Sequence, residues 1–195
     1  MSMGSEDADA DDARRVLAGD LAAFGGIVHR WQSRLINLAW RFCSDRTLAE
    51  DMAQEAFVKA FRALHTFRGQ SAFSTWLVAI SLNCYRSWLR DRKPRAVSLD
   101  VARSLTLEPN ALTGLLDRER AAVVRHLVLK LPPRYRDPLV LYYFQEMNLS
   151  TTAQVLGIPE GTLKARLSRG RALLSRRYVA RFSQGSTREE QHGRT

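Results

Sequence analysis

A predicted helix over residues 160–178 carries basic side chains beside a strip of small ones. At about 100 degrees per residue, Leu163, Leu167, Gly170 and Leu174 share one face, which we expect to pack inward. The opposite face holds Gly161, Ala165, Ser168 and Ala172. Small side chains allow close approach to a DNA major groove, and long cations reach bases or phosphates. The cations expected to contact DNA are Lys164, Arg166, Arg169 and Arg171, although an amphipathic basic helix could also dock on a protein.

The residues before this helix predict a second, shorter helix and a turn. Asn148 is a good N-cap for a helix over residues 149–156, and Gly157 can supply the left-handed residue that ends it. Pro159 then turns the chain into the basic helix. This order predicts a helix-turn-helix.

A second stripe of polar side chains lies on the predicted helix over residues 73–92. Ala79, Asn83, Arg86 and Arg90 follow one another at helical spacing and form a stripe separate from the face with Phe73, Trp76, Leu77, Ile80 and Cys84. An asparagine can pair with a base edge while guanidinium groups hold phosphates. From the residues alone, an asparagine such as Asn83 is more often an ordinary polar surface residue.

Enzymatic chemistry finds no support in the motifs. The sequence contains no phosphate-binding G-x-x-x-x-G-K and no H-E-x-x-H, and His29, His65, His126 and His192 are not spaced as metal ligands. Cys43 and Cys84 form no C-x-x-C pair and sit among apolar neighbours, which favours buried free thiols. We therefore expect no enzyme activity, no metal and no cofactor.

Net charge favours a polyanionic partner. The 195 residues carry a net charge of +10, concentrated in residues 86–95 and 160–181. Two separate basic blocks indicate two contact surfaces, the alternative being solvated helical faces. With no signal peptide and no apolar run long enough for a membrane span, we expect a cytoplasmic protein without membrane insertion.

Helical periodicity predicts an all-α fold with two small domains. A helical bundle of three or four helices is expected at 13–92, a flexible linker at 93–114 and a helix-turn-helix domain at 115–180. The segments 1–12, which is acidic, and 184–195 are expected to be disordered tails.

Two further local predictions concern individual helices. Residues 48–64 show a wide face of apolar residues expected to be buried, which includes Phe57 and Phe61, while Asp51, Gln54, Glu55 and Arg62 remain outside. A short helix is expected to end at Phe144, with Pro138 in its first turn.

Several motifs together resemble those of bacterial sigma factors of the extracytoplasmic-function class. They occur in the family's order at residues 54–60 (QEAFVKA), 67–69 (FRG), 73–77 (FSTWL), 131–136 (LPPRYR), 157–159 (GIP) and 161–167 (GTLKARL). The resemblance covers residues 13–92 and 115–180. It implies sigma region 2 in the first domain and sigma region 4 in the second, joined by a linker too short for the middle domain of primary sigma factors.

The resemblance implies roles that spacing alone does not. Asp51, Gln54 and Glu55 match positions that bind the clamp helices of the polymerase beta-prime subunit. Asn83 matches the position that captures a flipped base of the minus-ten element, near Arg86 and Arg90. The base-facing positions of the minus-thirty-five reader are matched by Lys164, Ala165, Ser168 and Arg169, with Arg166 and Arg171 beside them.

Three residues depart from the family pattern. Ala79 stands where many relatives carry a base, which removes one expected phosphate contact. Glu146 replaces a frequent glycine. Thr152 stands where an aliphatic side chain usually packs, and its buried hydroxyl is expected to bond a carbonyl four residues back.

The expected function is that of a sigma factor, which binds core RNA polymerase, directs it to promoter DNA and assists melting. An anti-sigma factor is a further possible partner in this class. The alternative is a helix-turn-helix regulator that binds operators as a dimer.

Overall fold

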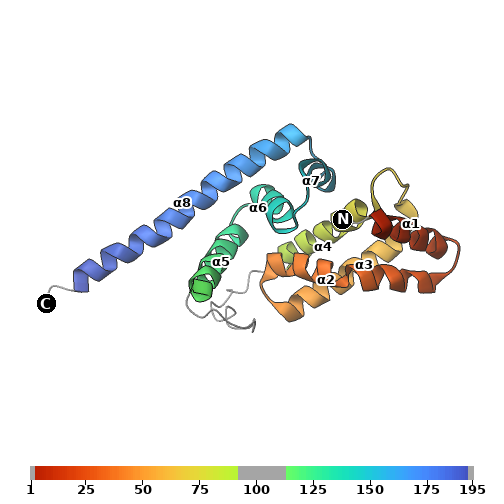
Figure 1. Ribbon diagram of the computed structural model, residues 1–195, viewed down its shortest axis with the longest axis horizontal. Helices are drawn as coiled ribbons and strands as arrows, with labels where there is room; N and C mark the ends of the chain where they lie inside the picture. Colours follow the sequence, from red (N-terminus) through yellow and green to blue (C-terminus); the bar gives the residue numbers. More distant parts are fainter. Residues whose placement is uncertain (1–2, 92–112, 193–195) are drawn as a thin grey trace. The chain divides into compact units, whose positions relative to one another are not determined.

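The computed structural model describes residues 3–91 and 113–192, all of whose regular elements are helices. The expected all-α fold is confirmed. The chain divides into two compact units, unit 1 with helices α1 to α4 and unit 2 with α5, α6, α8 and most of α7 (Figure 1). No helix in the described part is both long and apolar enough to cross a bilayer.

Among the described residues 3–91, unit 1 contains four α-helices and two short 3-10 turns. They are α1 (Met3–Leu17), η1 (Leu21–Ala23), α2 (Phe24–Cys43), α3 (Arg46–Ala63), η2 (Leu64–Thr66) and α4 (Phe73–Asp91). In Figure 1, α2 and α3 run side by side, and α4 packs on α3. The α2–α3 corner is sharp because Ser44 adopts a left-handed φ of 55° and Asp45 caps α3, its carboxylate accepting from the Leu48 amide at 3.0 Å.

The core of unit 1 joins α2, α3 and α4. Leu35, Met52, Leu77 and Tyr85 are almost fully buried. The Tyr85 hydroxyl donates to the Leu35 carbonyl oxygen at 3.1 Å, and burial raises the pKa of this phenol. A satisfied hydroxyl in the core fixes how α4 lies against α2.

The acidic N-terminal segment is ordered, so the expected tail at 1–12 is wrong for residues 3–12. Asp9 is fully buried and accepts from Arg30 Nε at 2.7 Å and from Trp31 Nε1 at 2.8 Å. Asp12 accepts from Arg30 Nη2 at 2.6 Å, close to Gly26, where a Cβ would lie 2.5 Å from its Oδ2. These long-range pairs fasten α1 to α2.

The described part of unit 2 contains four α-helices and one π turn. They are α5 (Thr113–Leu129), α6 (Pro133–Leu139), the π turn η4 (Val140–Phe144), α7 (Leu149–Leu156) and α8 (Glu160–His192). The expected linker at 93–114 lies outside the described residues, except for Thr113 and Gly114, which begin α5.

The helix-turn-helix is confirmed at α7 and α8. Asn148 Oδ1 accepts from the Thr151 amide at 2.8 Å, and Gly157 adopts a φ of 63° after the last residue of α7. The second helix begins at Glu160 as expected, but it continues to His192 rather than ending at Tyr178. Residues 184–192, expected to belong to a tail, continue this helix. No proline follows Tyr178, and a formed helix propagates at little cost per residue.

The helix before the motif differs from the expected one. It begins at Pro133, so Pro138 lies inside α6 rather than in its first turn. Pro138 lacks an amide proton, and the following residues form a π turn in which the Gln145 amide donates to the Val140 carbonyl at 3.1 Å.

Two family departures have local explanations in unit 2. Glu146 adopts a φ of 52°, a left-handed conformation that glycine adopts more easily. Thr152 is fully buried, and its hydroxyl lies 3.5 Å from the Met147 carbonyl oxygen, five residues back instead of the expected four. A long hydrogen bond of this kind offsets only part of the cost of burying the hydroxyl.

Candidate nucleic-acid and protein interfaces

The first half of α8 presents a polar face to solvent. Leu163 and Leu167 are buried, and α8 packs on α6. A Cβ at Gly170 would lie 3.2 Å from Leu139 Cδ1, so glycine permits this close packing. The side chains that are left exposed are Lys164, Ala165, Ser168, Arg169 and Arg171, and Arg166 is half-buried. All six predicted residues therefore lie on the surface of one helix.

The cations of this face lack neutralising partners in the described part of the chain. Among those side chains, none of Lys164, Arg166, Arg169 and Arg171 forms an ion pair. Two cations of unit 1 differ, since Arg30 binds two aspartates and Arg46 binds Glu50 at 2.7 Å. An uncompensated row of cations on a helix is a surface suited to phosphate.

Arg171 has a neutral partner that the sequence analysis missed. Its Nη1 donates to the hydroxyl of Tyr143 in η4 at 3.3 Å. The two residues are 28 positions apart, and no spacing rule within one helix relates them. The contact follows from the packing of α6 on α8, which sequence periodicity does not specify.

The predicted stripe on α4 is partly assembled. Asn83 is exposed, although Leu82 and Cys84 on either side are buried. Arg86 Nη1 donates to Asn83 Oδ1 at 3.2 Å, which orients the amide. Arg90 is exposed one turn further, with Asp91 3.4 Å from its Nε. Asn83 and Arg86 are thus joined by a hydrogen bond, while Asp91 partly compensates the charge of Arg90.

An aromatic cluster lies at the beginning of α4. The Trp76 ring packs 5.3 Å from Phe73 and 5.5 Å from Phe67, between ring centroids. Phe73 is buried as expected, but Trp76 is only half-buried. Trp76 and Asn83 are seven residues apart, which places them on the same side of the helix. Sequence reasoning had assigned Trp76 to the inward face.

The predicted acidic patch on α3 is smaller than its residue types suggest. Asp51 and Gln54 are exposed. Glu55 Oε1 lies 2.8 Å from Lys59 Nζ one turn away, and this hydrogen bond raises the pKa of Lys59. Part of the charge of Glu55 is therefore neutralised within the helix.

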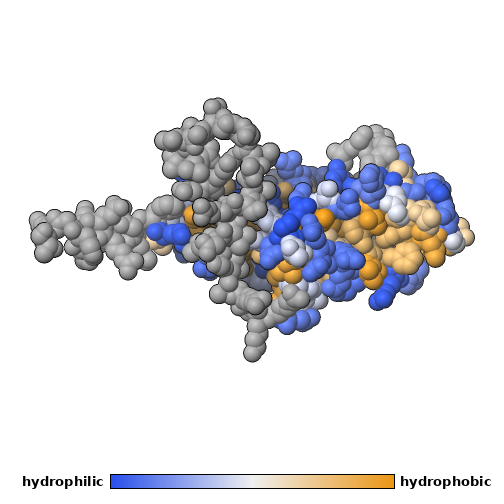
Figure 2. Space-filling view, turned by 90° about the horizontal axis from the view of Figure 1, so that it is seen from below, coloured by the Kyte–Doolittle hydropathy of each residue, from blue (hydrophilic) through white to orange (hydrophobic). Residues whose placement is uncertain are grey.

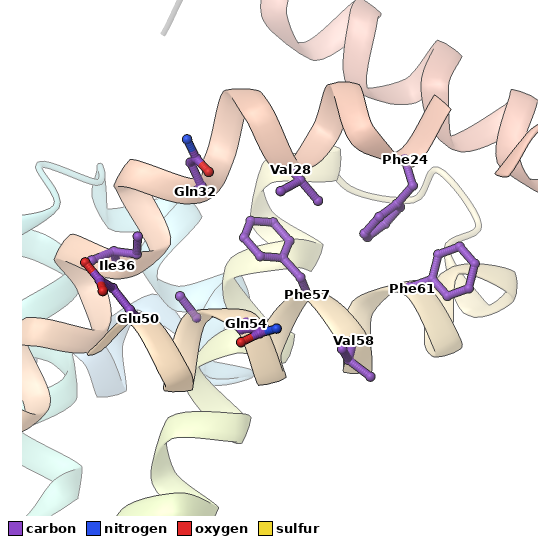
Figure 3. Close-up of a pocket in the computed structure, with 10 residues that line it drawn as sticks. Phe24, Val28, Gln32, Ile36, Glu50, Gln54, Phe57, Val58 and Phe61 are labelled. Carbon is purple, nitrogen blue, oxygen red and sulfur yellow. The ribbon is translucent and has the colours of Figure 1, made fainter. Parts of the chain in front are cut away.

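An apolar groove between α2 and α3 lies beside Gln54 (Figure 3). Its volume is about 450 Å³, and the apolar side chains that line it include Phe24, Val28, Phe57, Val58 and Phe61. Figure 2 shows the molecule from below relative to Figure 1, and a broad apolar surface is visible on this face.

Phe61 was expected to be buried, but it is 38% exposed, and Val58 is 43% exposed. The Phe61 ring meets Phe24 edge to face at 5.1 Å, so α2 covers only one side of it. The sequence analysis missed the groove because helical periodicity predicts which face of α3 is apolar, but not how closely α2 packs against that face.

Comparison with known proteins identifies both units. The family Sigma-70 region 2 matches residues 27–95, and Sigma-70, region 4 matches residues 121–174. The chain is 34% identical over 184 residues to the RNA polymerase sigma-H factor of Pseudomonas aeruginosa, covering 89% of this chain and 95% of the relative. It is 33% identical over 171 residues to the ECF RNA polymerase sigma factor SigW of Bacillus subtilis, covering 83% and 91%.

Solved structures agree with these relatives. The structure of CnrH in complex with the cytosolic domain of CnrY matches with a TM-score of 0.65 and 29% identity, over 89% of this chain and 98% of that one. The sigma factor RpoE of Bartonella quintana, solved with the anti-sigma factor NepR, matches with a TM-score of 0.58 and 25% identity, over 80% and 96%. The chain belongs to the sigma-70 family, among its ECF RNA polymerase sigma factors.

Proposed function

We propose that three surfaces of this sigma factor divide the work of promoter recognition, α3 binding core polymerase, α4 the minus-ten element and α8 the minus-thirty-five element. The observation that carries the proposal is the contrast in charge between the uncompensated cations of α8 and the apolar, partly neutralised surface of α2 and α3. The first suits DNA and the second a protein. The protein is a transcription initiation factor and not a classical enzyme.

At the minus-thirty-five element, α8 is proposed to enter the major groove with Ala165 and Ser168 toward the floor. Lys164 and Arg169 flank them and can reach base edges, while Arg166 and Arg171 lie nearer the groove walls. Since Ala165 and Ser168 offer few hydrogen-bonding groups, DNA shape contributes to specificity here.

At the minus-ten element, Asn83 is proposed to hold a base that has left the stack. Arg86 occupies its Oδ1 at 3.2 Å, so the amide NH2 is the group directed to the base edge. Half-buried Trp76 on the same side offers an aromatic face for stacking. Extruding one base costs a few kcal/mol, which such contacts can offset without ATP hydrolysis. Arg86 and Arg90 supply positive charge for the backbone.

Core polymerase is proposed to bind α3 through Asp51, Gln54 and Glu55, with the beta-prime clamp helices as the partner. The apolar groove extends this surface, and a helix that buries Val58 and Phe61 gains roughly 25 cal/mol per Å² of apolar area covered. Because a related sigma factor was solved in complex with an anti-sigma factor, we also infer an anti-sigma partner for this chain. Its place of action is then the cytoplasm, with polymerase and chromosome.

The test is transcription in vitro with core polymerase and a genomic promoter library. We expect a complex with core enzyme in gel filtration, and promoter-specific transcripts that neither component gives alone. The operator-binding regulator of the alternative would bind duplex DNA tightly as a dimer without core enzyme. Absence of any complex with core polymerase would contradict the proposal.

Two variants and a matched control test the polymerase surface. Gln54→Ala and Asp51→Ala should weaken the complex with core enzyme, whereas Arg62→Ala, an exposed change further along α3, should not. If all three variants bind core enzyme as tightly as the wild type does, α3 is not part of the interface.

A further inference from the structure

The contact between Tyr143 and Arg171 has the features of a phosphate-binding pair. We propose that these two side chains hold one DNA phosphate at the edge of α8, Tyr143 donating its hydroxyl proton and Arg171 supplying the positive charge. The inference rests on the proposed entry of α8 into the minus-thirty-five groove, and it adds a contact residue from outside the helix-turn-helix.

The hydrogen bond between Tyr143 and Arg171 leaves donors on both side chains that an anion could accept from. The Tyr143 oxygen accepts from Arg171 Nη1 at 3.3 Å, so its own proton is still to be donated. Arg171 has five N–H groups and uses one of them in this bond. A phosphate oxygen placed beside the pair would accept from both residues. Bonds to an ionised acceptor are shorter and stronger than this neutral one.

Both side chains are accessible. Tyr143 is 46% exposed, and its ring is held by an edge-to-face contact with Tyr142 at 4.9 Å. Arg171 is exposed and forms no ion pair with the described carboxylates. A large aromatic ring that stays at the surface beside a cation retains its polar tip for a partner.

The position of Arg171 on α8 points to a groove wall. Arg171 lies seven residues after Lys164, about 10 Å along the helix and on nearly the same side. Ala165 and Ser168 lie further round the helix, toward the floor of the groove. A helix about 10 to 12 Å across fills a major groove of similar width, so its flank faces the phosphates of one strand.

Packing brings Tyr143 to that flank. Gly170 lets α6 approach α8 so closely that Leu139 would touch a Cβ there. The π turn η4 follows α6 directly, and it places Tyr143 beside Arg171, the residue after Gly170. Because π turns are uncommon and often occur at functional sites, this placement supports a binding role.

The experiment uses the full chain with core polymerase, on a promoter that the library selects. Duplexes are prepared with a single neutral methylphosphonate at each position near the minus-thirty-five element. We expect Tyr143→Phe to weaken binding on the order of tenfold, as loss of a hydrogen bond to a charged group does. At one phosphate, the methylphosphonate should weaken the wild type but cause no further loss in Tyr143→Phe. Arg171→Ala should identify the same phosphate.

Two controls separate the loss of a phosphate contact from a general loss of folding. Tyr135→Phe removes a hydroxyl from α6 in the same unit and should bind like the wild type. Thermal unfolding of Tyr143→Phe should match that of the wild type. If Tyr143→Phe binds like the wild type at every phosphate, or its loss depends on base identity, the inference is wrong while the proposed function stands. If the wild type selects no promoter, both are wrong.

Discussion

The buried carboxylate of Asp9 should be the main attachment of α1, and Asp9→Ala tests this. The substitution leaves the Trp31 indole N–H, in a residue 4% exposed, without its acceptor at 2.8 Å. Arg30 loses its bond of 2.7 Å but keeps Asp12 at 2.6 Å. A buried donor left unsatisfied costs about 1 to 3 kcal/mol, and breaking a buried ion pair about 3 to 5 kcal/mol. Because Arg30 retains one partner, we expect a loss of about 3 kcal/mol.

The assay is urea unfolding followed by tryptophan fluorescence, together with hydrogen exchange in residues 3–17. Small domains are stable by only about 5 to 15 kcal/mol, so the expected loss is a large share of the stability of unit 1. If α1 detaches before the rest unfolds, its amides should lose protection while those of α2 to α4 keep theirs.

Asp11→Ala is the matched control. Asp11 lies two residues away on α1, its side chain is 59% exposed, and it pairs at 3.2 Å with Arg14, which is 76% exposed. Exposed pairs contribute about 0 to 1 kcal/mol, so this variant should resemble the wild type. Equal losses for Asp9→Ala and Asp11→Ala, or a loss below about 1 kcal/mol for Asp9→Ala, would refute the reasoning.

Three further predictions concern DNA and the thiols. Arg169→Ala should cost about 1 to 3 kcal/mol at the selected promoter if Arg169 reads a base, and mainly flatten the salt dependence if it binds phosphate; titrations at several salt concentrations distinguish these outcomes. Asn83→Ala should impair opening more than closed-complex binding, and normal permanganate reactivity of the melted strand would count against base capture. Burial raises the pKa of Cys43 from 9.0 to about 11 and also raises that of Cys84, so the thiolate, which dominates only above the pKa, is scarce at pH 8. Iodoacetamide should therefore modify native protein far more slowly than urea-unfolded protein, and similar rates would contradict the burial.

Features signalled by neighbouring residues could be predicted from the sequence. The Asn148 cap, the left-handed Gly157 and the beginning of α8 at Glu160 all follow from residues next to the element they delimit. The exposed face of α8 follows from periodicity, because buried leucines fix the remaining positions. The exposure of Asn83 follows from helical periodicity in the same way, because its neighbours Leu82 and Cys84 are buried.

Features created by contacts distant in sequence could not be predicted. The acids of α1 look like those of a disordered tail, because the partners of Asp9 lie 21 and 22 residues further on. Phe61 looks buried because periodicity does not reveal that α2 covers only one side of it. The contact between Tyr143 of η4 and Arg171 spans 28 positions, and only the packing of α6 on α8 brings the two side chains together.

The two kinds of surface differ in the force that would hold their partners. On α8, Lys164 and Arg169 lack carboxylate partners among the described side chains, so binding there would release counterions and weaken steeply with salt. On α3, Lys59 already compensates Glu55, and the adjacent groove is apolar. Apolar burial depends little on moderate salt. If these two surfaces bind as proposed, the factor would remain on core polymerase at salt concentrations that release its hold on DNA.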